Sequence, residues 1–482
     1  MNINIRTNKN FATQLNKLDQ EYGEEFRSLQ GLDEDKLSFT DFINNFIDVD
    51  TVADASVDAS SNIAQKDVVV LLSEMSKPHQ KLLAFHKLYY EIHKMYGFKV
   101  ANEAFEAMWN YAIYMHDFNT ATFISYCFAY DIKDIVEKGL FFIDNYNAKP
   151  PKHLDSFVQI LMEGICFLAR RQSGAVGLPN LIPYLYYFWS RDVANGYYTK
   201  DPETYKRQQI QALIYRLNQP WVRSDQSAFT NVSVFDHPYF EAIFGGSQFP
   251  DGKFMIDEEE EIIQFQKDFI DVINEIREEN VFTFPVLTTS LLYQNNKFVD
   301  EDFAKWSCEA SRKWNLFNFF TDSTVNSLSN CCRLKSDVTD LYFNSIGGTA
   351  LKVGSVKVST INIARLAYEN KDNKNKFLEA LKNLTELNLK ILDAQRHIIM
   401  RNVEKGLLPN FSSGLIDFEH LYSTVGINGI YETIKTFGYT YVDEIGNTYY
   451  TDDAYILGKE IFETIRGCID EFVKDKNYKI NI

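Results

Sequence analysis

Apolar residues between Lys66 and Met115 recur at spacings of three and four, which is the period of an amphipathic helix. The positions that carry this period are Val69, Leu72, Met75, Leu82, Leu83, Phe85 and Leu88. The segment before them is polar and acid-rich and ends in the small-residue stretch 53–61, a pattern typical of helical segments followed by a loop. We therefore expect a mostly helical N-terminal region over residues 1–115, with two or three amphipathic helices after Lys66.

After Asp117 the pattern changes to short β-prone runs that alternate with longer helical periods. Helices are predicted at Leu154–Arg171, Thr204–Leu217, Glu258–Arg277 and Lys376–Glu404, the last ended by Gly406. Strands are predicted at Phe229–Phe235, Val281–Leu287, Ser355–Ile363 and Gly438–Val442. This alternation predicts an α/β fold over residues 116–482, with strands buried beneath helices and no internal repeat.

Composition narrows the class of protein. The chain has 482 residues, 45% of them hydrophobic, so it is long enough to bury a large core. Its formal net charge of −17 leaves no broad basic surface, so direct nucleic-acid binding is not expected. The apolar run Phe157–Leu168 is broken by Gln159 and Glu163, and the start of the chain is polar, so we expect neither a membrane span nor a signal peptide. The expected location is the cytoplasm.

The cysteines predict thiol chemistry and no disulfide framework. There are six, none in a CxxC pair: Cys127, Cys166, Cys308, Cys331, Cys332 and Cys468. Such a sparse set argues against a disulfide-built fold and against a four-thiolate zinc site within this chain. We identify no other metal-ligating group of residues, so no metal site is expected here.

Two of these cysteines are adjacent. Cys331 and Cys332 precede Arg333 in a segment that we predict to be a loop, and a neighbouring cation favours the thiolate form. The alternative is that each packs as a small buried hydrophobic residue. Cys127 lies in a mostly apolar run, so residue type alone makes it a core strand position, with His116 hydrogen-bonded near the end of that run.

Three further patterns have simpler interpretations. The glycine-containing stretch 347–355 lacks the GK[ST] ending of a phosphate-binding loop and leads into a strand, so its glycines indicate close backbone approach. The acidic run Glu258–Glu261 is typical of a helix N-terminus. His153, which follows two prolines, is expected in the first turn of a helix.

Seven stretches, in the same order along the chain, resemble the anaerobic, class III ribonucleoside-triphosphate reductases. They are His116–Phe118 with Tyr126–Cys127, Pro150–Leu154, Asn218–Pro220 with Gln226–Asn231, Phe282–Pro285, Cys331–Leu334, Gly354–Leu366 and Tyr422–Gly429. One such stretch alone is weak evidence, but seven in the same order make a chance resemblance improbable.

The resemblance implies a ten-stranded α/β barrel made of two antiparallel halves, with a central finger loop near residues 329–336. Cys332 takes the position of the thiyl radical, and Cys127 takes that of the cysteine facing it across the substrate. The radical removes the 3′-hydrogen of the ribose, and Cys127 supplies a proton and reducing equivalents as the 2′-hydroxyl leaves. Both cysteines should therefore face one cavity, which Asn362 should also line, while Cys166, Cys308 and Cys468 should be packing residues.

The remaining site residues also come from the resemblance. Asn362 matches a polar position that binds ribose hydroxyls, with an ordinary strand-end amide as the alternative. Glu432 is a candidate for the proton-transfer carboxylate, with a solvated helical glutamate as the alternative. The positions that the resemblance assigns to substrate binding are His116, Gln226, Ser227, Gly354 and Ser355.

The sequence also departs from the family. Ser224 and Asp225 stand where two glycines are usual, and no domain of the size of an ATP cone precedes the matched region. Residues 1–482 contain neither the four-cysteine zinc site nor the glycyl-radical motif. We therefore expect a split enzyme, or one interrupted by an intein or within its gene, that is incomplete as a barrel, inactive alone, and needs a C-terminal glycyl-radical polypeptide carrying the zinc. The alternative is a chain truncated by design.

Other partners implied by the resemblance are a radical-SAM activating enzyme with S-adenosylmethionine and an iron-sulfur cluster, a second copy of the assembled enzyme in a homodimer, the ribonucleotide substrate, and nucleoside triphosphate effectors. Two other interpretations stay open. In the first, the chain is an inactive nucleotide-binding or scaffold remnant. In the second, it is another glycyl-radical enzyme that shares the barrel and the finger cysteine.

Overall fold

The computed structural model describes residues 8–32, 38, 40, 43–44, 68–143, 147–198, 201–219, 227–280, 282–325, 327–329, 335–337 and 351–482. Among them, the segments that the sequence predicts as helical form α1 (Lys9–Leu29), α4 (Val68–Trp109), α7 (Leu154–Ala169), α9 (Pro202–Leu217), α11 (Glu259–Glu279) and α14 (Lys374–Glu404). The helical N-terminal region is thus observed. Helix α4 is bent at Gly97, whose φ is 87°, so it behaves as two helices.

Further helices connect and cover the strands. They are α5 (Phe118–Ala121), α6 (Lys133–Lys138), α8 (Leu181–Ala194), α10 (His237–Phe244), α12 (Glu301–Ser311), α13 (Ile363–Glu369), α15 (Pro409–Ser412), α16 (Ile430–Thr436) and α17 (Asp452–Val473). Short 3₁₀ turns occur at Met255–Glu258 and Phe418–His420. The first of these leads into α11, where Glu259 and Glu260 lie in the first turn as the acidic run predicts.

Ten strands form one mixed sheet. They are β1 (Ile113–Met115), β2 (Cys127–Ala129), β3 (Val176–Leu178), β4 (Thr230–Phe235), β5 (Val286–Gln294), β6 (Lys297–Phe298), β7 (Phe317–Asp322), β10 (Val353–Asn362), β11 (Leu421–Asn428) and β14 (Ile480–Asn481). Two separate hairpins are β8 (Ser327–Ser329) with β9 (Lys335–Asp337) and β12 (Thr440–Val442) with β13 (Thr448–Tyr450).

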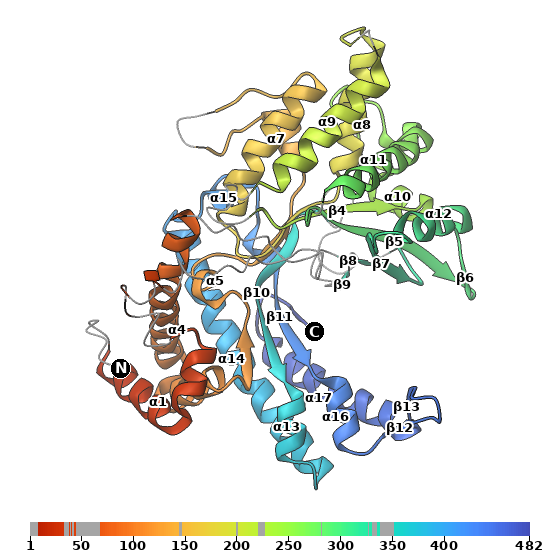
Figure 1. Cartoon of the computed structure of the whole chain (residues 1–482). Helices are drawn as coiled ribbons and strands as arrows, with labels where there is room; N and C mark the ends of the chain where they lie inside the picture. The colour runs from red at the N-terminus through yellow and green to blue at the C-terminus, as the bar shows by residue number, and fades with distance from the viewer. Residues whose placement is uncertain are drawn as a thin grey trace.

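Most of the sheet consists of two parallel halves that run in opposite directions, while β1 and β6 pair antiparallel with β10 and β5. Strands β2, β3, β4, β5 and β7 are parallel neighbours, and so are β10, β11 and β14. The halves meet where β2 pairs antiparallel with β10. Figure 1 shows helices α7, α9 and α11 outside the first half and α14 outside the second. This arrangement confirms the predicted α/β class and its two antiparallel halves.

Three hydrophobic clusters hold the layers together. The largest packs α7–α11 on the first half-sheet, and another joins β10 and β11 to α13, α14 and α17. The third joins α1 and α4 to α14, so the N-terminal helices share a core with the helix that covers the second half-sheet. Figure 1 shows these helices next to one another. Strand β1 also pairs with β10. The N-terminal region is therefore built into the fold.

One predicted strand is shifted. The strand expected at Val281–Leu287 begins only at Val286 and continues to Gln294. The backbone N–H groups of Thr283 and Phe284 donate to the side-chain Oδ1 of Asn218, at 3.2 and 2.9 Å, and Pro285 has no N–H to donate. These backbone groups are therefore unavailable to a β ladder. Among the described helices, none is long and apolar enough to span a membrane.

Candidate active site

Cys127 lies where the two halves of the sheet meet. It is the first residue of β2, is only 4% exposed, and pairs directly with Ser355 of β10. The backbone N–H of Tyr126 donates to the Ser355 carbonyl at 3.0 Å, which fixes the register next to the thiol. The antiparallel junction thus brings together two predicted site residues that are far apart in the sequence.

The thiol itself is held by the start of the neighbouring strand β3. The backbone N–H of Ala175 donates to Cys127 Sγ at 3.1 Å. A Cβ atom at Gly174 would lie 2.4 Å from the same sulfur, so a larger residue there would displace it. The side chain of Cys127 is therefore fixed by backbone contacts on a neighbouring segment.

Gly354 allows β10 to approach β2 closely. A Cβ atom at this position would lie 2.2 Å from the Cys127 carbonyl oxygen and 2.9 Å from Phe128 Cα, distances that no real side chain tolerates. The predicted role of this glycine in close backbone approach is confirmed. Ser355 is completely buried, and its Oγ donates to the Lys357 carbonyl at 3.2 Å.

His116 lies beside the same junction, at the end of β1. Its Nε2 is 2.8 Å from Thr360 Oγ1 on β10. Its ring makes edge contacts with Tyr114 and with Tyr126, the residue before Cys127, with ring centroids 4.9 and 6.2 Å apart. The structure therefore places His116, Cys127 and Ser355 along one stretch of β10.

Lys357 is a residue at this junction that the sequence analysis missed. It is 0% exposed, and its Nζ donates to the backbone carbonyl of His116. The ring of Tyr126 lies 5.8 Å from the ammonium. Burial lowers the pKa of Lys357 to about 7, although the charges of Asp117 and Cys127 favour its protonated form. The only signal in the sequence is a single lysine inside a β-prone run.

Asn362 and Glu432 lie away from Cys127. Asn362 is seven residues beyond Ser355 on β10, about 23 Å at roughly 3.3 Å per residue. There it caps α13, accepting from the Arg365 N–H at 3.1 Å. Glu432 is exposed in the first turn of α16. The structure therefore does not bring these two residues to the thiol with which the sequence grouped them.

Ser227 is buried just before β4. The register aligns Phe128 with Val176 and Val176 with Thr230, so Ser227 lies at the same edge of the first half-sheet as Cys127. Two strand spacings of about 4.8 Å separate their strands. The other predicted site residues, Gln226 and Cys332, lie outside the described residues, as does Cys331.

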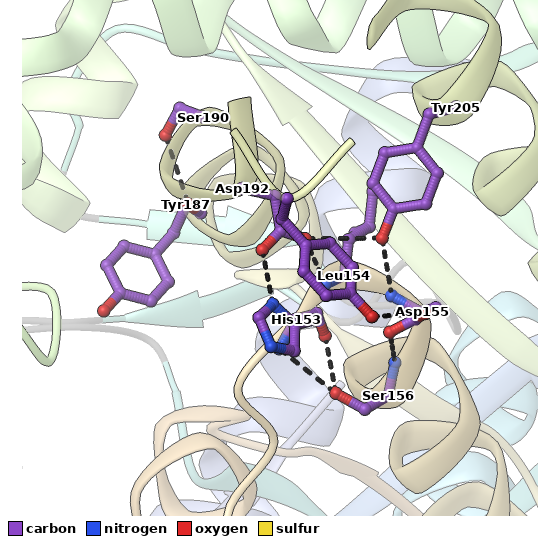
Figure 2. Close-up of polar contacts among 9 residues, drawn as sticks. His153, Leu154, Asp155, Ser156, Tyr187, Ser190, Asp192 and Tyr205 are labelled. Atoms are coloured by element: carbon purple, nitrogen blue, oxygen red, sulfur yellow. Dashed lines mark hydrogen bonds and ion pairs between the residues drawn. The ribbon is translucent and has the colours of Figure 1, made fainter. Parts of the chain in front are cut away.

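The proline-rich stretch before α7 has a structural role. His153 Nδ1 lies 2.8 Å from Asp192 Oδ1 on α8, and the other Asp192 oxygen accepts from the Leu154 N–H at 2.8 Å (Figure 2). Ser156 completes the cap, since its Oγ accepts from the His153 N–H at 3.1 Å. The ring of His153 also stacks on Tyr197, with centroids 3.6 Å apart. This motif therefore fixes the start of α7 against α8.

The other described cysteines are free thiols. Cys166 and Cys468 pack against hydrophobic clusters as expected, but Cys308 is exposed. It lies on the outer side of α12, whose buried side carries Phe303, Ala304, Ser307 and Ser311. Within the part of the chain that the structure describes, no group of three or more histidine, cysteine or acidic side chains could hold a metal ion.

Comparisons with known proteins agree with this geometry. The family model described as anaerobic ribonucleoside-triphosphate reductase matches residues 76–482, well over half of the chain. A comparison with curated protein sequences gave no match.

The solved structures similar to this chain include the anaerobic ribonucleotide reductase from Thermotoga maritima with dATP bound in the specificity site. It is 34% identical, with a TM-score of 0.87, over 100% of this chain and 78% of that one. The same enzyme in complex with dATP and CTP, and with glycerol in the active site, gives a TM-score of 0.88 in each case, again at 34% identity, over 100% of this chain and 76% of those. The chain belongs to the anaerobic ribonucleoside-triphosphate reductases.

Proposed function

We propose that this chain is the N-terminal part of the catalytic unit of its reductase and works by thiyl-radical chemistry, with Cys332 as the radical residue and Cys127 as its partner thiol. The observation that carries the proposal is the position of Cys127. Its sulfur is held by the Ala175 N–H at the junction of the two half-sheets, opposite Ser355. A buried thiol fixed in this way is suited to face a substrate that lies against the junction.

In the proposed reaction the thiyl radical of Cys332 takes the 3′-hydrogen of the ribose, so an S–H bond forms as the C–H bond breaks. Cys127 then gives its proton to the 2′-hydroxyl, which leaves as water. Positioned acids of this kind contribute about 10²–10⁴-fold in rate. Substrate binding is assigned to His116, Gln226, Ser227, Gly354 and Ser355. The position of His116, Gly354 and Ser355 beside Cys127 supports this assignment.

The radical is proposed to come from a glycyl-radical polypeptide outside residues 1–482, which would also carry the zinc site. A radical-SAM activating enzyme, with S-adenosylmethionine and an iron-sulfur cluster, would generate it. By analogy with the Thermotoga maritima enzyme, whose structures hold dATP in a specificity site, we propose that the assembled homodimer binds nucleoside triphosphate effectors. The strand β14, which pairs with β11 alone among the described strands, offers a free edge to a completing segment.

The test uses the complex reconstituted with the glycyl-radical polypeptide and activated. Cys332→Ser should abolish deoxynucleotide formation while leaving nucleotide binding nearly unchanged, because a hydroxyl fills almost the same volume and cannot hold the radical. Cys331→Ser is the matched control and should be much milder. Cys127→Ser should still exchange the 3′-hydrogen or release base, without forming product.

Three outcomes would contradict the proposal. Loss of activity in Cys331→Ser with activity kept in Cys332→Ser would move the radical by one residue. Full activity in both variants would exclude the thiyl mechanism for this chain. Turnover by the chain alone, with no second polypeptide, would remove the need for a separate radical subunit.

A further inference from the structure

Lys357 is a buried cation without a buried anion to match it. Its side chain is fully enclosed, and no ion pair between its ammonium and a carboxylate is found among the described residues. The partners that the structure gives it are the backbone carbonyl of His116 and the face of the Tyr126 ring. Burying a charge with so few partners costs stability, so a purely structural position would favour an apolar side chain.

Its place in the sheet explains where that charge acts. Strand β10 pairs with β2 at residues 353–355 and with β1 at residues 359–361, and Lys357 lies in the gap between these two pairings. The register with β11 also shifts between Ser355 and Lys357, a bulge that redirects the side chains that follow. The ammonium therefore lies between the end of β1 and Tyr126, the residue that precedes Cys127.

We infer that Lys357 is a positioning residue for Cys127, whose buried positive charge stabilises the thiolate that remains when the thiol gives up its proton. The inference rests on the proposed role of Cys127 as proton donor. In that step the S–H bond breaks, the proton bonds to the departing 2′-oxygen, and the electron pair stays on sulfur. Water leaves with the electron pair of the C2′–O bond, and the substrate radical is left with one positive charge. A fixed cation beside Tyr126, at the junction that holds the sulfur, stabilises this product of proton transfer.

The charges that surround Lys357 come from three elements. Asp117, after β1, and Cys127, on β2, favour its charged form, whereas Lys81 on α4 opposes it. Lys81 itself lies over the rings of Phe85 and Phe118, each 5.9 Å away. Among these three groups Cys127 is the thiol, so it is the group on which the ammonium would act.

The test measures the pH dependence of Cys127 alkylation in the whole chain without nucleotide. Iodoacetamide is added under reducing, anaerobic conditions, and the modified Cys127 peptide is quantified by mass spectrometry. The alkylation rate is plotted against pH. The midpoint of this curve reports the pH at which the thiolate forms, and the plateau rate at high pH reports how accessible the sulfur is to the reagent. Exposed Cys308 in the same samples serves as the internal control.

In Lys357→Met, which keeps the length and loses the charge, the Cys127 midpoint should rise by about one pH unit or more. Alkylation at a fixed pH below both midpoints should then slow about tenfold. In Lys357→Arg, whose charge persists at every pH of the assay, the midpoint should stay at or below that of the wild type. Cys308 should be unchanged in both variants.

An unchanged Cys127 midpoint in Lys357→Met overturns the inference, whatever happens to the plateau, since a change in packing alone moves only the plateau. If that variant does not fold, a midpoint raised in Lys357→Arg overturns it, and a midpoint at or below the wild-type value supports it. Failure of the proposed function gives a different result. In that case the Cys127→Ser enzyme would still form product, while Lys357→Met would still raise the pH midpoint of Cys127 alkylation.

Discussion

At its first residues strand β10 presses against β2 so closely that Gly354 has no space for a side chain, whereas at its last residue the same strand turns into α13 with Asn362 as the N-cap. Toward the first end, β10 has a bulge and the buried Lys357, and the buried thiol of Cys127 lies beside it on β2. The second end satisfies its backbone groups by ordinary capping. The bulge, the buried lysine and the tight contact at Gly354 each cost stability, and all three lie toward one end of the strand. Such a concentration of costly features is expected of a functional site.

The largest effect is expected from Gly354→Ala. The added Cβ would lie 2.2 Å from the Cys127 carbonyl oxygen, which is backbone and cannot rotate away. Overpacking of this kind costs about 3 kcal/mol at the upper end of its usual range, and it would displace Cys127 from Ser355. Urea unfolding should show the loss of stability, and product formation by the assembled enzyme should fall steeply.

Gly467→Ala in α17 is the matched control, because nothing lies within 4 Å of its added Cβ. Alanine there should stabilise the chain by about 0.5–1 kcal/mol through helix propensity. Equal stability of the two alanine variants would show that the β2–β10 junction is less tightly packed than the structure indicates.

A smaller, pH-dependent effect is expected from Lys357→Met. Burial lowers the pKa of Lys357 to about 7, so the folded chain holds this proton less tightly than the unfolded chain does. Below pH 7, folding bears the full free-energy cost of burying the ammonium. This cost falls as the pH rises from 7 toward about 10.4, which is the pKa of lysine in the unfolded chain. The methionine variant should therefore be more stable than the wild type by about 2 kcal/mol at pH 6, with the difference shrinking by pH 10.

Unfolding of both proteins across this pH range measures the difference. Lys459→Met is a suitable control, since the Lys459 side chain is 76% exposed, and its stability difference should stay within about 0.5 kcal/mol at every pH. A Lys357→Met difference that did not depend on pH would mean that the ammonium is better solvated than its burial implies.

At the other end of β10, Asn362→Ala should cost about 1 kcal/mol, because it removes the acceptor for the Arg365 N–H. Asn362→Ser keeps a capping oxygen and should recover most of this stability. Thermal unfolding of the two variants tests the capping role. If instead Asn362→Ala kept its stability and the assembled enzyme lost substrate affinity, the amide would bind ribose and the contrast between the two ends would fail.

The contrast also shows what sequence reasoning can and cannot reach. The long helices follow from apolar spacing, as α7 and α14 show, and Gly354 was correctly linked to close backbone approach. Lys357 was missed because a single lysine in a strand normally faces solvent, and only the gap between β1 and β2 buries it. Asn362 was grouped with Cys127 by the family resemblance, and the sequence alone does not reveal which end of a long strand approaches a thiol.

The smallest effect is expected from Glu432→Gln. Glu432 is exposed in the first turn of α16, at the same end of the second half-sheet as Asn362. Its carboxylate interacts there with the helix dipole and solvent, so neutralising it should change stability by less than about 0.5 kcal/mol and leave product formation unchanged.

Glu91→Gln is the contrasting variant, because Glu91 is completely buried and accepts from Arg401 and His397 at 2.6 and 2.7 Å. That substitution should destabilise the chain clearly. If Glu432→Gln lowered the rate of product formation tenfold or more at unchanged stability, the proton-transfer carboxylate would lie at the far end of β10, and both ends of the strand would belong to one active site.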